Sequence, residues 1–398
     1  MAIVQISRIT QRKGLQIDLP QLAGAEFGWS VDSRRLFIGN GTLAEGAPVI
    51  GNTEILTEFS DILSFQTTYT YKGEAAGYVV QTGPSSNAPV TLSLQNWMDQ
   101  WASVKDFGAM GDGVTDDAPS INAAIAQLLN GYPQSGNLAV TLYFPPGNYI
   151  INSTILLYPF ITIQGAGVNC TSITAMTGTD MLWMFETADS LGQTGANIGL
   201  NNTTLPKFIN ISDLMISTND QLISAFNCVR YLNICIKDCY MIGGWNSTLA
   251  PGTDAALSLL TIGNTINSSD FRVFNTTINN FSNAILAPDP VSNTFISFSN
   301  FTNLWRGINL ANPNFGGPHN MCITNSALSS IADYAIYNGS QHATVSTNNF
   351  YSATGGIYWA STSSKNVSMG EVFDVLIGVT DAGSSNSIIL NPGQSNLP

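Results

Sequence analysis

The sequence predicts an all-β protein built as a solenoid of stacked coils, closed at its start by a short α-helix and preceded by a small β-rich domain. The first observation is composition, since only 10% of the 398 residues are charged and 44% are hydrophobic, while Gly, Asn, Ser and Thr are abundant. This mix is typical of short strands joined by polar turns. The other two observations are a repeat of 22 to 25 residues beyond residue 167 and a helix-then-strand segment at 104–149.

Residues 1–62 form a separate N-terminal module. Phe27 to Val31 and Leu36 to Ile38 are apolar runs separated by a short polar segment, which predicts a β-hairpin. The module holds five of the chain's thirteen basic residues, Arg8, Arg12, Lys13, Arg34 and Arg35. They form either a docking face toward an acidic partner or an ordinary solvated surface.

Residues 63–102 link this module to the solenoid. Strands are expected at 67–72 and 78–82, and Ser93 is placed to cap a short helix over 94–101. Trp97 and Trp101 are four residues apart and form one apolar edge of that helix. The edge is either a contact between subunits or a surface that packs on the mouth of the solenoid.

The segment 104–149 predicts a tight turn, a helix and then two strands. Gly111 to Gly113 favour the turn because glycine enters positive φ freely. Thr115 is expected as the N-cap of a helix whose first turn holds Asp116 and Asp117, and its apolar stripe is Ile121, Ala124, Ile125 and Leu128. Strands are expected at 140–144 and 149–151, so the helix acts as a lid on the open end of the β-structure.

The repeat is marked by a polar residue two positions after an apolar one. The marked residues are separated by 25, 37, 25, 25, 23 and 23 residues, and they are Asp213, Asp238, Asn275, Asn300, Asn325, Asn348 and Glu371. The long gap contains an insertion at 243–270 with a possible additional strand. Later in each coil Ile285, Ile308, Ile336, Ile357 and Ile377 are expected to stack in a column about 4.8 Å apart.

The polar marked positions have two interpretations. Asn275, Asn300 and Asn325 are expected to form ladders at the turns. Two stacked carboxylates, Asp213 and Asp238, would lie about 5 Å apart, near the separation in a retaining glycosidase. They are therefore catalytic candidates as well as turn residues.

Aligning the coils on Ile308 and Ile336 brings together a candidate glycan-binding patch. Trp305 then lies beside Asp333, and Arg306 beside Tyr334, with Asn283 one coil earlier. The set combines aromatic faces, a carboxylate, an amide and a guanidinium, as sugar sites often do. Asp333 is a third catalytic candidate, and the alternative for the whole set is an exposed edge with a snorkelled arginine.

The segment from Ser103 to about Gly167 resembles the opening of the pectate-lyase-like β-helix domain of bacteriophage tailspikes and some polysaccharide-degrading enzymes. The residues that carry the resemblance are Gly108, Gly111, Asp112, Gly113, Asp116, Asp117, Phe144, Pro146, Gly147, Tyr149 and Gly165. It implies that residues 103–380 form a right-handed parallel β-helix, with 381–398 as a C-terminal tail. Glu26 to Gly28 and Leu36 to Gly41 resemble the N-terminal attachment module of phage fibres, which implies docking to other virion proteins.

Charge and rare residue types exclude several partners. A net charge of −13 opposes binding to nucleic acid or insertion at an anionic membrane. The five cysteines contain no CxxC pair, so we expect reduced core residues and no metal or cofactor. The N-terminus lacks the apolar core of a signal peptide, so we expect a soluble protein assembled in the cytoplasm of a host cell.

Three functions are compatible with these observations. The first is a phage spike or short fibre, expected as a homotrimer, that is anchored to the virion and presents its β-helix to a host surface polysaccharide. The second is a polysaccharide depolymerase, a hydrolase or lyase, which the short tail after residue 380 disfavours. The third is a purely structural head, collar or baseplate appendage.

Overall fold

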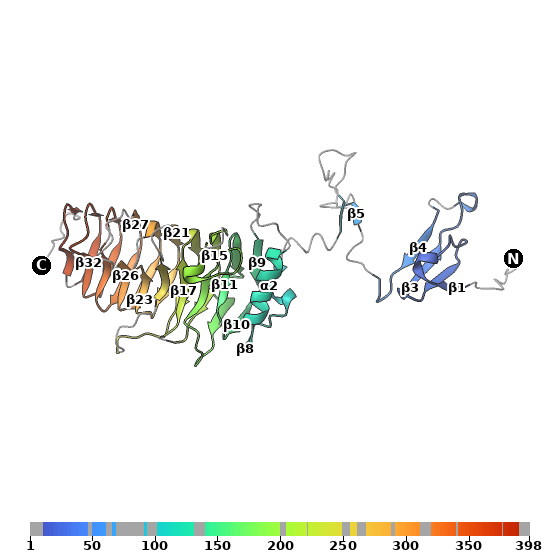
Figure 1. Ribbon diagram of the computed structural model, residues 1–398, viewed down its shortest axis with the longest axis horizontal. Helices are drawn as coiled ribbons and strands as arrows, with labels where there is room; N and C mark the ends of the chain where they lie inside the picture. The colour runs from blue at the N-terminus through green and yellow to red at the C-terminus, as the bar shows by residue number, and fades with distance from the viewer. Residues whose placement is uncertain are drawn as a thin grey trace, which may run out of the picture. The chain divides into compact units, whose positions relative to one another are not determined.

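The computed structural model describes residues 11–46, 50–60, 66–68, 91–93, 102–130, 140–199, 204–220, 222–248, 255–260, 268–287, 291–310, 320–339, 341–375 and 377–389 (Figure 1). The chain divides into two compact units, residues 1–100 and 101–398. Each unit has its own sheets.

The first unit contains a four-stranded sheet in the order β1-β2-β3-β4, with β1 and β2 parallel and the other pairs antiparallel. The hairpin predicted from the two apolar runs is confirmed, since Phe27 pairs with Ile38 and Trp29 with Leu36. Leu22 is buried at its centre. The elements of this unit are β1 (Gln11–Gly14), η1 (Gln16–Asp18), β2 (Phe27–Ser30), β3 (Arg35–Gly39), η2 (Leu43–Glu45), β4 (Asn52–Ile55) and the antiparallel pair β5 (Gln66–Thr68) and β6 (Thr91–Ser93).

Some of the predictions for the N-terminal module and the linker lie outside the described residues. These are Arg8 near the start of the chain, the strand expected at 78–82, and the helix expected at 94–101 with both tryptophans.

The second unit is a right-handed parallel β-helix, which confirms the predicted fold class. From β9 onward the chain visits three parallel sheets in strict rotation, and each coil adds one strand to each sheet. Figure 1 shows the coils stacked one after another from the end near α2 to the last strands of the chain. Among the described residues the three sheets have 11, 10 and 9 strands.

The strands of each sheet follow in chain order. The 11-stranded sheet contains β7 (Ala102–Ser103), β9 (Val140–Phe144), β12 (Ile161–Gly165), β15 (Lys207–Ser212), β18 (Leu232–Lys237), β21 (Ser268–Phe274), β24 (Val291–Ser297), β27 (Met321–Thr324), β30 (Thr344–Ser346), β33 (Val367–Met369) and β36 (Ser387–Ile389). The 10-stranded sheet contains β8 (Asp112–Asp116), β10 (Gly147–Ile151), β13 (Thr171–Ala175), β16 (Met215–Ser217), β19 (Tyr240–Ile242), β22 (Thr277–Asn279), β25 (Asn300–Leu304), β28 (Ala327–Ile331), β31 (Asn349–Tyr351) and β34 (Val372–Asp374). The 9-stranded sheet contains β11 (Ile155–Leu157), β14 (Trp183–Thr187), β17 (Ser224–Val229), β20 (Ala255–Leu260), β23 (Asn283–Leu286), β26 (Arg306–Leu310), β29 (Tyr334–Asn338), β32 (Gly355–Trp359) and β35 (Ile377–Asp381).

Two of these strands change the sequence interpretation. β20 lies in the insertion at 243–270, but it is the regular third strand of its coil, because it pairs with β17 and β23. β36 lies within the segment assigned to the C-terminal tail, and it pairs with β33.

The helix α2 (Ala118–Asn130) covers the first coil. Its predicted apolar stripe is confirmed, because Ile121, Ala124 and Ile125 are fully buried and Leu128 packs on the same core. Burial of this stripe, more than helix propensity, stabilises such a short helix. The short helices η4 (Val104–Phe107) and η5 (Gly195–Asn197) complete the unit.

The prediction for the start of α2 was wrong by two residues, because the helix begins at Ala118 and not at Asp116. Thr115 belongs to β8, where its hydroxyl donates to the Asp112 carboxylate. The Asp116 carboxylate instead accepts from the Ala118 N–H at 3.2 Å, and Asp117 accepts from the N–H groups of Met110 and Gly111. Position 111 requires a glycine, since its φ is 62° and a Cβ there would lie 2.8 Å from the Tyr149 ring.

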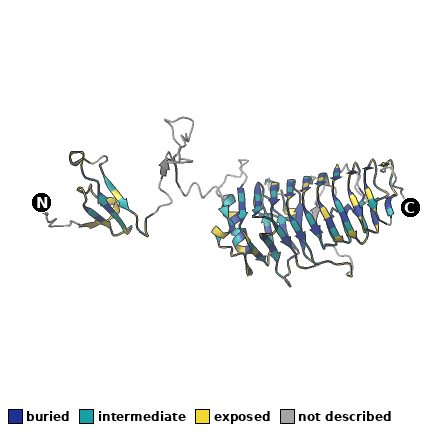
Figure 2. Cartoon of the chain, turned by 180° about the vertical axis from the view of Figure 1, so that it is seen from behind, coloured by how far each residue is buried: buried dark blue, intermediate teal, exposed yellow. Residues whose placement is uncertain are grey.

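Aliphatic columns fill the interior of the coils, and Figure 2 shows the buried residues along the strands. In the 9-stranded sheet Ile285, Ile308, Ile336 and Ile357 stack in register, as predicted. Ile377 does not continue this column, because it pairs with Gly355 and Val379 takes the place beside Ile357. In this coil the column position lies 22 residues after Ile357, at Val379, so Ile377 comes two residues too early.

The polar marked positions divide into two kinds. From β15 to β33, each strand of the 11-stranded sheet is followed by a residue with left-handed backbone. In these seven successive coils the residues are Asp213, Asp238, Asn275, Phe298, Asn325, Thr347 and Gly370. Four of the predicted turn residues therefore hold that place. Asn300 instead begins β25, while Asn348 and Glu371 lie one position later and are buried.

The buried position after the left-handed turn forms a ladder of hydrogen bonds along the coils. The backbone N–H of Thr276 donates to Ser299 Oγ, that of Ser299 to Ser326 Oγ, that of Ser326 to Asn348 Oδ1 and that of Asn348 to Glu371 Oε2, at 3.3, 3.2, 2.9 and 2.7 Å. Each link satisfies a main-chain donor that the coil buries and that no strand can pair.

All five cysteines are free, but only Cys228 and Cys239 are core residues, whereas Cys170 is exposed and Cys235 and Cys322 are partly exposed. The core assignment was thus wrong for these three, which occupy outward positions of their coils. Within the described residues, none of the helices has the length and apolar character needed to span a membrane.

Candidate glycan-binding site

The predicted glycan-binding patch lies on one face of the β-helix, over the strands β26, β29 and β32. The backbone places its members because the same corner recurs in each coil. The Arg306 N–H donates to the Ser282 carbonyl, the Asp333 N–H to the Trp305 carbonyl, and the Gly355 N–H to the Asp333 carbonyl, at 2.9, 2.9 and 3.1 Å. Residues that are 20 to 30 positions apart in sequence are thereby neighbours.

Arg306 is the central residue of the patch. Its guanidinium lies 4.3 Å from the ring centroid of Trp305 and 4.1 Å from that of Tyr337. Its Nε donates to Asp333 Oδ2 at 2.6 Å, and its Nη1 donates to Asn309 Oδ1 at 3.4 Å. The planar cation is held by two aromatic rings and two oxygen acceptors, an arrangement that a lysine could not make.

Asn283 and Tyr334 connect to this centre from the neighbouring coils. Asn283 is buried, and its Oδ1 accepts from Asn309 Nδ2 at 2.9 Å. The Tyr334 ring lies 5.0 Å from that of Tyr358, and Gly355 makes room for it, since a Cβ there would lie 2.3 Å from the ring. The structure therefore brings all five predicted residues together in one cluster.

The sequence interpretation missed three members of the cluster, Asn309, Tyr337 and Tyr358. They form an outward column in register, because β26, β29 and β32 are paired strands. The rings of Tyr337 and Tyr358 stack at 4.9 Å with 13° between their planes. A signal was available, since each of these residues directly follows an isoleucine of the buried column.

The cluster has the chemistry of a carbohydrate site. The tyrosine and tryptophan rings provide apolar surface for the C–H groups of a sugar ring. Amides and hydroxyls can donate to and accept from its hydroxyls, and the guanidinium can donate to them. Arg306 and Asp333 are partly exposed, with 18% and 27% of their side-chain surfaces accessible. Both are therefore within reach of a ligand.

The catalytic candidates do not form one centre. Asp213 and Asp238 follow the paired strands β15 and β18, and both have a left-handed backbone. Asp213 Oδ2 accepts from Ser212 Oγ at 2.8 Å, and Asp238 Oδ1 accepts from Asn275 Nδ2 at 2.7 Å. The first bond lies within one turn, and the second joins the turns of two neighbouring coils. Asp333 lies elsewhere, in the ion pair with Arg306.

The basic residues assigned to virion docking have different environments. Arg12 pairs with Glu26 at 2.7 Å, Arg35 lies 3.7 Å from Glu54, and the Arg34 guanidinium lies 4.9 Å from the Phe59 ring centroid. The Ala23 N–H and the Arg12 guanidinium lower the pKa of the Glu26 carboxyl below its usual value. Lys13 is exposed on β1, so the described basic residues present one free ammonium and three guanidinium groups that already have neighbours.

The described part of the chain contains no cluster of metal ligands. No group of three His, Cys, Asp or Glu side chains there is close enough to hold an ion.

Comparisons with known proteins identify relatives of the β-helix. Residues 101–375 match the family model described as rhamnogalacturonase A/epimerase, pectate lyase-like. A mannuronan C5-epimerase, AlgE4 of Azotobacter vinelandii, is 34% identical over 110 residues, which are 26% of this chain and 19% of that protein. The chain covers between 6% and 19% of the length of each of the first eight relatives in sequence.

One solved structure shows the same fold at low identity, and a second has a lower score. The DFA-IIIase of Arthrobacter chlorophenolicus A6 has a TM-score of 0.51 at 14% identity, with 69% of this chain and 70% of that chain covered. Tailspike protein 3 of bacteriophage CBA120 has a TM-score of 0.43 at 13% identity, with 93% and 76% covered. The match of a single family model to most of the chain decides the assignment. The chain belongs to the rhamnogalacturonase A/epimerase, pectate lyase-like family.

Proposed function

We propose that this protein is a tailspike or short fibre of a bacteriophage and that it binds a polysaccharide on the host surface through the Arg306 cluster. The observation that carries the proposal is the position of Arg306 between the rings of Trp305 and Tyr337, with Asp333 and Asn309 as acceptors. An arginine wedged between aromatic rings on a rigid solenoid presents polar and apolar contacts in fixed positions. Such pre-organisation lowers the entropy lost on binding.

The first unit is proposed to attach the protein to the virion. Support comes from the resemblance of Glu26 to Gly28 and Leu36 to Gly41 to phage attachment modules, and from the separate four-stranded sheet that contains them. Crosslinking of assembled particles through Lys13, followed by identification of the attached virion protein, tests this part. Homotrimer formation is proposed with it, and light scattering after size-exclusion chromatography measures the mass.

A binding experiment tests the glycan proposal. The full chain is incubated with polysaccharides purified from host strains, and affinity is measured by calorimetry. Arg306→Ala should weaken binding about tenfold or more, since central arginines in interfaces often contribute over 1 kcal/mol. Arg272→Ala is the control, because Arg272 lies near the Phe295 ring in the 11-stranded sheet. Equal affinity of the Arg306 variant and the parent would contradict the proposal.

Depolymerase activity is the second candidate, and family membership favours it. A glycosidase needs two carboxyl groups beside the scissile bond. A reducing-sugar assay on the bound polysaccharide decides, with Asp333→Asn, Asp213→Asn and Asp238→Asn as variants. Release of reducing ends that one of these changes abolishes would establish cleavage and identify the carboxylate. Binding without release supports a receptor-binding spike.

A further inference from the structure

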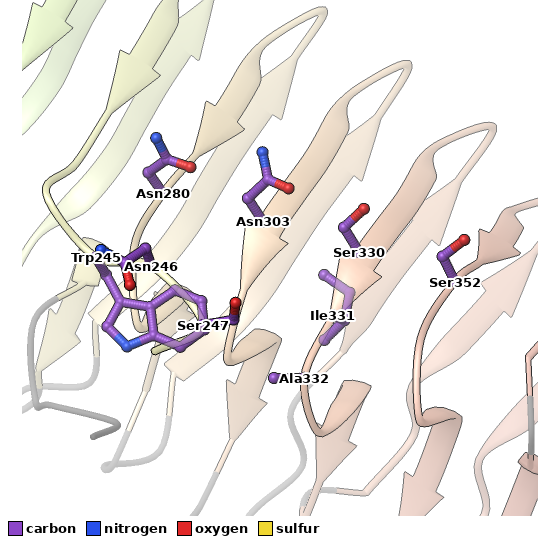
Figure 3. A pocket seen from close by; sticks show the side chains of 9 residues that line it. All are labelled: Trp245, Asn246, Ser247, Asn280, Asn303, Ser330, Ile331, Ala332 and Ser352. Carbon is purple, nitrogen blue, oxygen red and sulfur yellow. The ribbon is translucent and has the colours of Figure 1, made fainter. Parts of the chain in front are cut away.

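A pocket of about 370 Å³ lies at the corner between the 10-stranded and 9-stranded sheets. This volume is within the range of small-molecule sites, roughly 300–1,000 Å³. Its wall is built from two parts, the segment after β19 and the corner that recurs in four successive coils (Figure 3). The lining residues are Trp245, Asn246, Ser247, Asn280, Asn303, Ser330, Ile331, Ala332 and Ser352.

The lining offers hydrogen bonds and one aromatic ring, and none of its residues is charged. Figure 3 shows Asn280, Asn303, Ser330 and Ser352 in a row, one on each coil. All four have left-handed backbone, with φ of 61°, 52°, 54° and 54°. The row is therefore a second turn ladder, and its polar side chains face an open pocket, whereas the internal ladder of Ser326 and Asn348 is buried.

Trp245 gives the pocket an aromatic wall. Only 3% of its surface is exposed, and its backbone N–H donates to the Asn280 carbonyl at 2.9 Å. The indole Nε1 is buried and has no hydrogen-bond partner among the described residues. A buried indole N–H normally finds an acceptor.

The pocket is continuous with the Arg306 cluster through the chain itself. Ile331 and Ala332 line the pocket, and the next residue, Asp333, is the ion-pair partner of Arg306. The N–H groups of Ala332 and Asp333 donate to the carbonyls of Leu304 and Trp305, both at 2.9 Å. One rigid corner therefore carries both surfaces.

The charges of the combined surface cancel. Among the residues named for the pocket and the cluster, Arg306 is the one cation and Asp333 the one anion, and they are 2.6 Å apart. A uronate, sialate or phosphate group would need a cation that is not already neutralised. The net charge of −13 adds repulsion at longer range.

We propose that this pocket is a second subsite of the glycan site and that the polysaccharide bound across both is uncharged. The inference rests on the proposed function. It distinguishes this chain from the mannuronan C5-epimerase, which is named for an acidic polymer, because the described residues of the pocket and the cluster include no cation outside the Arg306–Asp333 ion pair. The pocket accepts a neutral sugar unit through the amides, the hydroxyls and the Trp245 ring.

A microbial glycan array tests the charge class. Its polysaccharides have either uncharged repeating units or repeating units that carry uronate, sialate or phosphate. We expect binding to uncharged members, with affinity that changes less than about twofold between 50 and 500 mM NaCl, since screening has no ionic contact to weaken. If acidic members were bound as tightly as neutral ones, the inference of an uncharged ligand would be overturned, and the proposed function would stand. No binding to any member would overturn the proposed function, and the inference with it.

Two variants test the pocket with the best neutral ligand from the array. Asn303→Asp introduces a carboxylate into the lining, and Ser247→Trp fills the pocket from its exposed rim. Both should weaken binding about tenfold or more. Asn325→Asp is the matched control, because Asn325 has a φ of 50° at the other turn and does not line the pocket. Parent-like affinity of both pocket variants, with melting temperatures equal to that of the control, would exclude the subsite.

Discussion

Arg306 Nε and Asp333 Oδ2 lie 2.6 Å apart on consecutive coils of the β-helix, and the same guanidinium contacts the rings of Trp305 and Tyr337. The ion pair removes the net charge of the cluster while leaving its planar faces and hydrogen-bonding groups in place. Recognition then depends on shape and stacking more than on charge. This distinction leads to the first prediction.

Arg306→Lys should weaken glycan binding about tenfold, which corresponds to roughly 1.4 kcal/mol. Lysine keeps the positive charge beside Asp333 but has no planar fork to lie between Trp305 and Tyr337. Calorimetric titration with the host polysaccharide measures the change. Arg272→Lys on the 11-stranded sheet should leave the affinity unchanged, and an equal loss in both variants would exclude a specific role for stacking.

Asn348→Ala should lower the free energy of unfolding by about 3 kcal/mol. The change removes the acceptor of the Ser326 N–H and the donor to the Ile323 carbonyl, and each buried group left unpaired costs roughly 1–3 kcal/mol. Thermal or denaturant unfolding measures the loss. The neighbouring Asn349 is exposed, so Asn349→Ala should stay within about 0.5 kcal/mol of the parent.

Stability should fall as the pH rises from 4.5 to about 7, because burial raises the pKa of Glu371 from 4.5 to about 7. In this window the folded protein keeps a proton that the unfolded chain has lost, so folding is favoured at the acid end and this contribution disappears as the pH passes the folded pKa. The full effect is up to about 3 kcal/mol.

The Glu371→Gln variant isolates this contribution. Its melting temperature should be less dependent on pH over the same window than that of the parent, since the amide keeps an acceptor for the Asn348 N–H without titrating. Asp374→Asn, an exposed change on the same coil, is the control. An unchanged pH slope in Glu371→Gln would show that the carboxyl is not the source.

Gly39→Ala should unfold the first unit without affecting the β-helix. A Cβ at this position would lie 2.1 Å from the Ala23 carbonyl oxygen and 2.7 Å from the Leu22 carbonyl, contacts that cost well over about 3 kcal/mol. Hydrogen exchange should show loss of protection in β2 and β3, with glycan binding retained. Gly14→Ala is the matched control, since nothing lies within 4 Å of its Cβ, and an equal loss in both would refute the explanation.

The sequence alone located most of the candidate cluster because the isoleucine column has a visible period. Aligning Ile308 with Ile336 was enough to bring Trp305 and Arg306 beside Asp333 and Tyr334. The same alignment failed two coils beyond Ile336, at Ile377, because that residue pairs with Gly355 and Val379 takes the column position beside Ile357. The sequence interpretation missed the column of Asn309, Tyr337 and Tyr358, because its members occupy the same position in successive coils but differ in residue type.

The pocket beside Trp245 could not be predicted from any local pattern in the sequence. Trp245 belongs to a segment that follows β19, and its neighbours Ser330 and Ser352 lie three and four coils further along the chain, where β22, β25, β28 and β31 stack. Their meeting depends on the path of that segment across the corner. The polar marked positions are similar, since Asn325 and Asn348 look equivalent in sequence, but one faces solvent and the other the core.

The sequence by itself determined the coil, its period, the apolar columns and the helix that covers the first turn, because each follows from alternation and spacing within about 25 residues. Tertiary structure alone decided which polar side chains are buried in the ladder of Asn348 and Glu371, which of them line the pocket, and that Asn309, Tyr337 and Tyr358 join the Arg306 cluster. The physical reason is that a shift of one residue at a turn reverses the direction of a side chain, and only the packed register of neighbouring coils sets that shift.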